Sequence, residues 1–191
     1  MKVVVVAPHP DDLEIFCGGT VAEHIKKGDE VVELLVTDGQ LGSLKNMLLG
    51  MLPGRLKGPD WGLGKRRREE AVRSAAFLKI QLKALGLVDR GVKCEHAELI
   101  QEAVRAERPE LVYAPDPEFA SYRHPDHLEV GRAVSGFRPV RFYHTSKPNL
   151  RFRVDKKIKV RAVRFHRSQW WVWGIFFRRR IGDWEEFREI P

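Results

Sequence analysis

The chain has 191 residues, 43% hydrophobic and 31% charged, a balance typical of a soluble globular protein, and we predict a single domain over residues 1–191. The 34 Lys and Arg exceed the 26 Asp and Glu, which gives a net charge of +8. This charge is consistent with binding to an anionic substrate, a membrane surface or nucleic acid, and equally with a basic surface that is simply solvated. Two cysteines without CxxC spacing argue against a disulfide framework and a cysteine-based zinc site, and they favour a reduced, cytoplasmic setting. The apolar runs are too short for a membrane span or a signal peptide.

Apolar runs alternate with amphipathic segments along the chain, a pattern typical of β–α units. Strands are expected over residues 3–7, 31–36, 83–88, 111–114 and 140–144, and helices over 20–27, 65–79, 98–107, 126–134 and 156–172. Residues 44–64 are rich in Gly and Pro, and we expect a long loop there with at most one helical turn. The alternation predicts an α/β fold with a mostly parallel sheet and helices on both faces.

The first expected strand, 3–7, ends in a loop that carries one imidazole and two adjacent carboxylates. These are His9, Asp11 and Asp12, and a Gly-Gly-Thr helix start follows them. Ligands of open α/β sheets bind at the carboxyl ends of the strands. His9 and Asp12 lie three residues apart on one tight loop, so both can reach a common point.

A second cluster, His124-Pro-Asp-His127, follows the expected strand 111–114. Catalytic zinc is commonly held by three protein ligands, with one position left open for water. We predict that His9, Asp12 and His127 bind the metal and that Asp11 serves as general base. His124 would protonate a leaving amine or stabilise an oxyanion, and Asp126 would orient an imidazole from behind the ligands.

Each cluster alone also suits ordinary turn and helix-cap chemistry, with Asp12 or Asp126 as the capping residue. Two such clusters, each placed after a strand, favour the metal site over the capping interpretation.

The paired motifs, His9-Pro-Asp-Asp-Leu-Glu14 with Gly18-Gly-Thr20 and His124-Pro-Asp-His127, resemble those of the PIG-L/LmbE family of zinc-dependent deacetylases. Three further segments resemble motifs of the same family, so the similarity covers most of the chain: Thr37-Asp-Gly-Gln-Leu-Gly-Ser43, Arg67-x-x-Glu70 and Lys159-x-x-Ala162-x-x-x-His166-x-Ser168-Gln169.

This resemblance implies a Rossmann-like fold, one Zn²⁺ per chain and removal of an acetyl group from an N-acetylglucosamine-containing substrate. It assigns His9, Asp12 and His127 to zinc, Asp11 to the general base and His124 to electrostatic or acid catalysis. Substrate contacts are implied for Arg67, Asp89 and Tyr122. The sequence departs from the family pattern at Gln40 and Lys79 and in the short chain after His127. These departures affect the expected identity of the substrate more than the expected reaction.

Residues 170–180 combine three tryptophans and two phenylalanines with Arg178, Arg179 and Arg180. One interpretation is a core or subunit-interface helix followed by a solvated basic end. The other is a peripheral contact with an anionic membrane. Tryptophans at 170, 171 and 173 cannot all face one core from a single helix, so we expect part of this surface to meet a partner, first of all a second copy of the chain.

We therefore expect a zinc amidohydrolase acting on a small N-acetylated glycoside or a lipid-linked sugar. An amidase acting on a thiol-sugar conjugate is the alternative within this class. A non-catalytic Rossmann-like module that binds nucleotide or RNA is the alternative from another class. It is disfavoured because Gly18-Gly19 is not a dinucleotide-binding fingerprint and no aromatic RNA-binding motif is present, so no nucleic-acid partner is expected.

Overall fold

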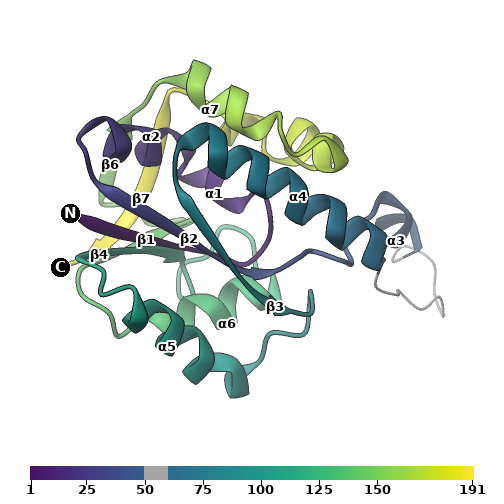
Figure 1. Cartoon of the computed structure of the whole chain (residues 1–191), viewed down its shortest axis with the longest axis horizontal. Helices are drawn as coiled ribbons and strands as arrows, with labels where there is room; N and C mark the ends of the chain where they lie inside the picture. The colour runs from purple at the N-terminus through teal and green to yellow at the C-terminus, as the bar shows by residue number, and fades with distance from the viewer. Residues whose placement is uncertain (50–59) are drawn as a thin grey trace.

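The computed structural model describes residues 1–49 and 60–191 and has a seven-stranded sheet at its centre (Figure 1). The strands are β1 Lys2–Ala7, β2 Glu30–Thr37, β3 Gln81–Leu87, β4 Leu111–Pro115, β5 Val140–Tyr143, β6 Leu150–Arg153 and β7 Trp184–Ile190. Their order in the sheet is β3-β2-β1-β4-β5-β7-β6. The first five strands pair in parallel, while β7 runs antiparallel to both β5 and β6. The predicted α/β fold with a mostly parallel sheet is confirmed.

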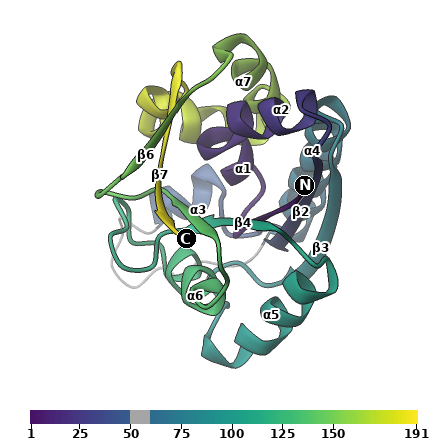
Figure 2. The ribbon, with the colours of Figure 1, turned by 90° about the vertical axis from the view of Figure 1, so that its left-hand side faces the viewer.

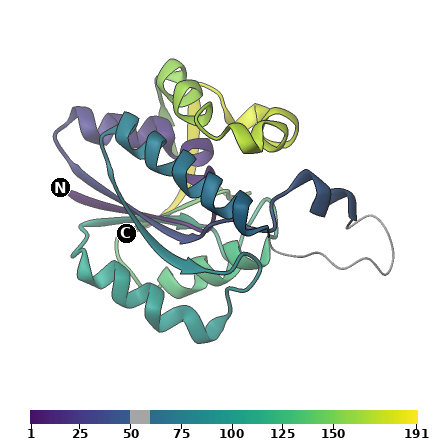
Figure 3. The ribbon, with the colours of Figure 1, turned by 45° about the vertical axis from the view of Figure 1, so that its right-hand side comes forward.

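Helices cover both faces of the sheet, as Figure 2 shows from the side. One layer holds α1 Asp12–Phe16, α2 Gly18–Lys26, α4 Trp61–Leu78 and α7 Lys156–Val163, and the other holds α5 Ala97–Ala106 and α6 Pro125–Val134. Side chains of β1 alternate between the two cores, because successive residues of a strand point to opposite faces: Val3 and Val5 pack under the first layer, Val4 and Val6 under the second. A further helix, α3 Leu44–Leu49, extends away from the sheet (Figure 3).

The strand order creates a topological switch point beside β1. From β1 the chain builds β2 and β3 on one side, then crosses back to place β4 and β5 on the other. The loops that leave β1 and β4 therefore diverge and open a crevice at the carboxyl edge of the sheet. Both His/Asp motifs lie at this edge.

The elements predicted from the sequence differ from the observed ones at several places. The helix expected over 65–79 begins earlier, at Trp61, because the Asp60 side chain accepts a hydrogen bond from the Leu63 N–H at 2.9 Å and caps it. The loop expected over 44–64 contains α3, and its residues 50–59 lie outside the described residues. The two C-terminal strands, β6 and β7, were not predicted.

The prediction of one helix over 156–172 is wrong for the second half of that range. After α7 ends at Val163, the chain continues through a 3-10 turn, Arg167–Gln169, and a π-helical turn, Val172–Phe176. Tertiary contacts end the helix, because the Ser168 N–H and hydroxyl both donate to the Glu70 carboxylate, at 3.0 and 2.6 Å.

The aromatic segment that follows is divided between core and surface. Trp173 and Phe177 pack against the core of the first layer, whereas Trp170 and Ile175 are 62% and 67% exposed. Within residues 1–49 and 60–191, none of the helices has the length and apolar character needed to cross a membrane.

Strand β7 fastens the C-terminal part of the chain to the start of α2. The buried Glu185 carboxylate accepts the Gly19 and Thr20 N–H groups at 2.9 and 2.8 Å. It also pairs with the buried Lys159 ammonium of α7 at 2.8 Å. A negative side chain thus satisfies free N–H groups of the first turn of α2, which holds α2, α7 and β7 together.

Helix α6, which carries His127, packs against β4 through Gly131. A Cβ atom at this position would lie only 2.4 Å from the Pro115 carbonyl oxygen. We expect Gly131→Ala to lower the free energy of unfolding by about 1–3 kcal/mol, the usual cost of overpacking. Gly136→Ala is the matched control, because nothing lies within 4 Å of the added methyl group there. Urea unfolding of both variants tests this, and equal stabilities would contradict it.

Candidate active site

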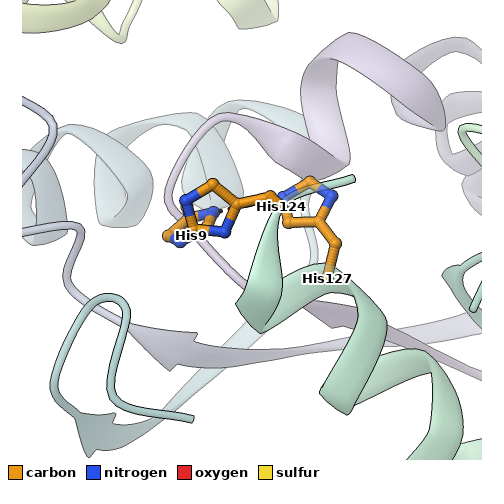
Figure 4. A group of neighbouring side chains, drawn as sticks. All are labelled: His9, His124 and His127. Carbon is orange, nitrogen blue, oxygen red and sulfur yellow. Dashed lines mark hydrogen bonds between the residues drawn. The ribbon is translucent and has the colours of Figure 1, made fainter. Parts of the chain in front are cut away.

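Three donor atoms from the two motifs meet at the carboxyl edge of the sheet. His9 Nδ1 lies 3.2 Å from His127 Nε2 and 3.4 Å from Asp12 Oδ2, and the last two atoms are 3.1 Å apart. All three side chains are buried. His9 comes from the loop after β1, Asp12 from the first turn of α1, and His127 from the first turn of α6. Figure 4 shows the two imidazoles together with that of His124.

This triangle has the dimensions of one face of a tetrahedral zinc site. Ligand atoms about 2.05 Å from zinc at tetrahedral angles lie about 3.3 Å from one another, so all three observed separations fit. Two imidazole nitrogens and a carboxylate oxygen are a donor set suited to zinc, and the fourth position of the tetrahedron stays free. The residues present therefore fit a bound divalent metal.

The electrostatics of the triangle favour ligation. Burial alone would raise the pKa of Asp12, but His127 and His9 hold it well below its usual value, so the carboxylate is ionised. Burial alone would lower the pKa of His9, but Asp89, Asp12 and Asp126 raise it well above its ordinary value. An excess of negative charge thus surrounds the two imidazoles, which is the environment a divalent cation needs.

Two carboxylates fix the other side of the His9 ring. Its Nε2 lies 3.1 Å from Asp126 Oδ2 and 3.3 Å from Asp89 Oδ1. Asp126 is fully buried and also accepts the Arg90 and Val92 N–H groups at 2.7 and 3.3 Å. A carboxylate that accepts the Nε2 proton leaves the Nδ1 lone pair free for a metal. The structure places Asp126, predicted to orient an imidazole, against the His9 ring.

Asp11 lies beside the triangle without belonging to it. Its Oδ1 is 3.1 Å from Arg67 Nη2, and its backbone is left-handed, with a φ of 95°. Burial raises the pKa of Asp11 to about 6, although Arg67 opposes the shift. A carboxyl group poised near neutrality suits general-base chemistry.

Arg67 is buried and holds the loop that follows β1. One guanidinium nitrogen donates to the Gly39 carbonyl at 2.9 Å, and the other donates to the Pro10 carbonyl at 2.8 Å as well as to Asp11. Gly39 makes room for it, because a Cβ at that position would lie 2.0 Å from Nη1. The family-like turn Thr37–Ser43 thus has a structural purpose here, since it encloses the arginine that contacts Asp11, the predicted general base.

His124 is the N-cap of α6, and its Nδ1 accepts the Asp126 N–H at 3.3 Å. Burial, together with the neighbouring His9 and His127, lowers the pKa of His124 to about 3, so the ring is neutral. Because Nδ1 is an acceptor, the ring proton resides on Nε2, which can donate a hydrogen bond to an oxyanion. His124 also brings a nitrogen within 4.8 Å of those of His9 and His127.

The remaining predicted residues lie around this centre. Tyr122 is half exposed, and its ring centroid lies 6.1 Å from that of His124 at the rim of the site. Asp89 follows β3 and lies behind His9, and its other oxygen accepts the Leu41 N–H at 3.0 Å. The predicted metal, base and rim residues are thus all brought together at one edge.

Sequence reasoning did not place His144 in this site. It follows β5, lies buried with its ring stacked on Phe16 at 4.4 Å, and has its centroid 5.6 Å from that of His127. The sequence signal that could have placed His144 near the site is its position directly after β5, the strand that pairs with β4.

A second buried group of charges involves Glu14 of α1. Glu14 Oε1 is 3.1 Å from His166 Nε2, and both side chains are fully buried. Burial alone would lower the pKa of His166, but Glu14 raises it, so the two form an ion pair. Burial and the Glu14 charge raise the pKa of Glu33 well above its usual value, and Glu33 is therefore neutral inside β2.

Comparisons with known proteins agree with this geometry. Residues 4–137 match the family model PIG-L, described as GlcNAc-PI de-N-acetylase. Diacetylchitobiose deacetylase of Thermococcus kodakarensis is 34% identical over 210 residues, covering 93% of this chain and 75% of that protein. Mycothiol S-conjugate amidase of Streptomyces coelicolor is 26% identical over 149 residues, covering 67% of this chain and only 48% of that protein.

Among solved structures, N,N'-diacetylchitobiose deacetylase from Pyrococcus horikoshii, in complex with its inhibitor MPG, superposes with a TM-score of 0.81 at 27% identity. The match covers 100% of this chain and 84% of that one. The two His/Asp motifs and the switch-point crevice fall within the matched region. The chain therefore belongs to the PIG-L (LmbE-like) family and is an amidohydrolase, a de-N-acetylase of GlcNAc-containing substrates.

Proposed function

We propose that this enzyme uses one zinc ion, held by His9, Asp12 and His127, to remove the acetyl group from a small N-acetylated glucosaminide such as diacetylchitobiose. The observation that carries the metal assignment is the triangle of donor atoms with sides of 3.1–3.4 Å. The substrate class is supported by the similarity to the two archaeal deacetylases.

Zinc in this position would polarise the acetamide carbonyl and lower the pKa of the attacking water. Asp11 takes a proton from that water as its oxygen attacks the carbonyl carbon. His124 donates its Nε2 hydrogen bond to the carbonyl oxygen as negative charge develops there. Asp11 then returns the proton to the amine nitrogen while the C–N bond breaks, which releases acetate and the free amino sugar.

Other side chains keep these groups in position. Arg67 anchors Asp11, while Asp126 and Asp89 fix the orientation of the His9 ring. Tyr122 lies at the rim, where a bound sugar would pass, and we propose that it contacts the substrate.

A substrate panel tests this proposal. The zinc-loaded enzyme should release acetate from diacetylchitobiose, and Asp11→Asn should slow that release by roughly 100-fold or more. N-acetylglucosaminyl-phosphatidylinositol and a mycothiol S-conjugate are the other arms, since the first tests a lipid-linked sugar and the second a thiol-sugar amidase. If only the thiol conjugate is hydrolysed, the proposed substrate class is wrong and the chain is a thiol-sugar amidase. If none of these amides is hydrolysed, the assignment of this chain as an enzyme is overturned.

We further propose that the exposed part of the aromatic segment contacts a second copy of the chain. Trp170 and Ile175 are exposed beside residues that pack into the core. Large apolar side chains of this kind are enriched at protein interfaces. Trp170→Glu/Ile175→Glu should then reduce the molar mass measured by light scattering from an oligomer to a monomer. Binding of the wild type to anionic vesicles without self-association would instead identify a membrane contact.

A further inference from the structure

A cavity lined by four arginines lies between α4 and α7, and none of the active-site residues lines it. Arg73 comes from α4, Arg161 from α7, and Arg164, Phe165 and Arg167 from the segment that follows it. The cavity has a volume of about 450 Å³. The two helices lie side by side on the same face of the sheet (Figures 1 and 3).

Four arginines, all exposed to solvent, line this space without acidic partners. Among the residues that the structure describes, none of these four guanidinium groups lies within 4.0 Å of a carboxylate oxygen. Some other exposed arginines do have one, as in the pairs of Arg105 with Glu98 and Arg132 with Glu129. Like charges gathered around one concave space repel one another, and an anion with several charges would relieve that repulsion.

One aromatic side chain, Phe165, lines the cavity among the arginines. Phe165 is half-buried and packs against Phe77 with ring centroids 5.5 Å apart, while the Arg161 guanidinium covers Phe77 at 4.7 Å. The cavity therefore offers guanidinium forks together with an aromatic surface. Guanidinium groups bind phosphate oxygens in pairs of parallel hydrogen bonds, and an aromatic face stacks on a planar ring.

We propose that this cavity binds a nucleoside diphosphate or a comparable oligophosphate, with its phosphates between Arg73, Arg164 and Arg167 and its planar ring against Phe165. A volume near 450 Å³ is that of an ordinary small-molecule site. The site is separate from the deacetylase centre, so the proposal stands independently of the proposed substrate.

Calorimetric titration of the zinc-loaded enzyme with ADP and with inorganic pyrophosphate tests the site. Arg73→Gln/Arg164→Gln removes one arginine from each side of the cavity. It should weaken the binding of both probes by roughly tenfold or more, since charge-assisted hydrogen bonds are lost. Arg66→Gln/Arg153→Gln is the control, because it removes the same charge from exposed arginines outside the cavity and should leave both affinities unchanged. Both variants keep the metal ligands, so any binding of the probes to the zinc affects them equally.

Two further measurements complete the test. Phe165→Leu should weaken the binding of ADP but not that of pyrophosphate. An equal loss of affinity for both probes would overturn the position assigned to the planar ring of the ligand. Without ligand, Arg73→Gln/Arg164→Gln should melt at or above the wild-type temperature and keep its deacetylase activity. Unchanged ADP affinity in this variant, or binding only to phosphatidylserine vesicles and to neither soluble probe, would overturn the proposal.

Discussion

Asp11→Asn is expected to reduce kcat for acetate release by roughly 100- to 10,000-fold, the usual contribution of a general base. Asparagine keeps the size of the side chain and tolerates the left-handed backbone that this position requires, with its φ of 95°. The amide cannot accept a proton from water, so the chemical step fails while the fold is preserved. Metal analysis of the same sample should give the wild-type zinc content, because Asp11 is outside the donor triangle.

Asp38→Asn is the matched control for this variant. Asp38 forms an ion pair with Arg68, and Asp11 forms one with Arg67, the preceding residue of α4. Unlike Asp11, Asp38 is not fully buried. The same change of charge beside an arginine should leave kcat within about twofold of wild type, as expected of a surface ion pair. Activity of Asp11→Asn close to that of Asp38→Asn, with zinc fully bound, would rule out Asp11 as the base.

Much of the candidate site could be predicted from the sequence, because its parts are local. His9 and Asp12 lie three residues apart on one loop, and the parallel β–α alternation brings the ends of β1 and β4 to the same edge. The paired motifs therefore indicated one centre before any distance was known. That Asp126 lies near the same centre was also predictable, since it adjoins His127 at the start of a helix.

The C-terminal third was not predictable in the same way, because tertiary contacts decide its structure. The 156–172 pattern is amphipathic, but the hydrogen bonds from Ser168 to Glu70 stop the helix, and no local signal shows that Glu70 lies nearby. Glu185 reads as an ordinary charged residue, yet it caps α2 from 165 residues away. The position of Arg67 against Asp11 likewise depends on the packing of α4 across the turn after β2.

Removal of either imidazole from the donor triangle should cost the enzyme its metal. His9→Ala and His127→Ala are each expected to lower the zinc content from about one per chain to near zero, since two ligands do not make a stable zinc site. Deacetylase activity should fall to the background rate in both. The rise in melting temperature that zinc gives the wild type should also disappear, because a metal that binds only the folded state stabilises it.

Two comparison variants separate ligation from a general loss of structure. Asp126→Asn keeps all three donor atoms but weakens the acceptor at His9 Nε2, so zinc affinity should fall about 10- to 100-fold and excess zinc should restore occupancy. His96→Ala removes an imidazole whose Nδ1 accepts only the Lys93 N–H, far along the chain from both motifs, and should leave zinc content and activity unchanged. Circular dichroism should give folded spectra for all four proteins. Full zinc content in folded His9→Ala or His127→Ala would contradict the ligand set and, with it, the role of the switch-point crevice as a metal centre.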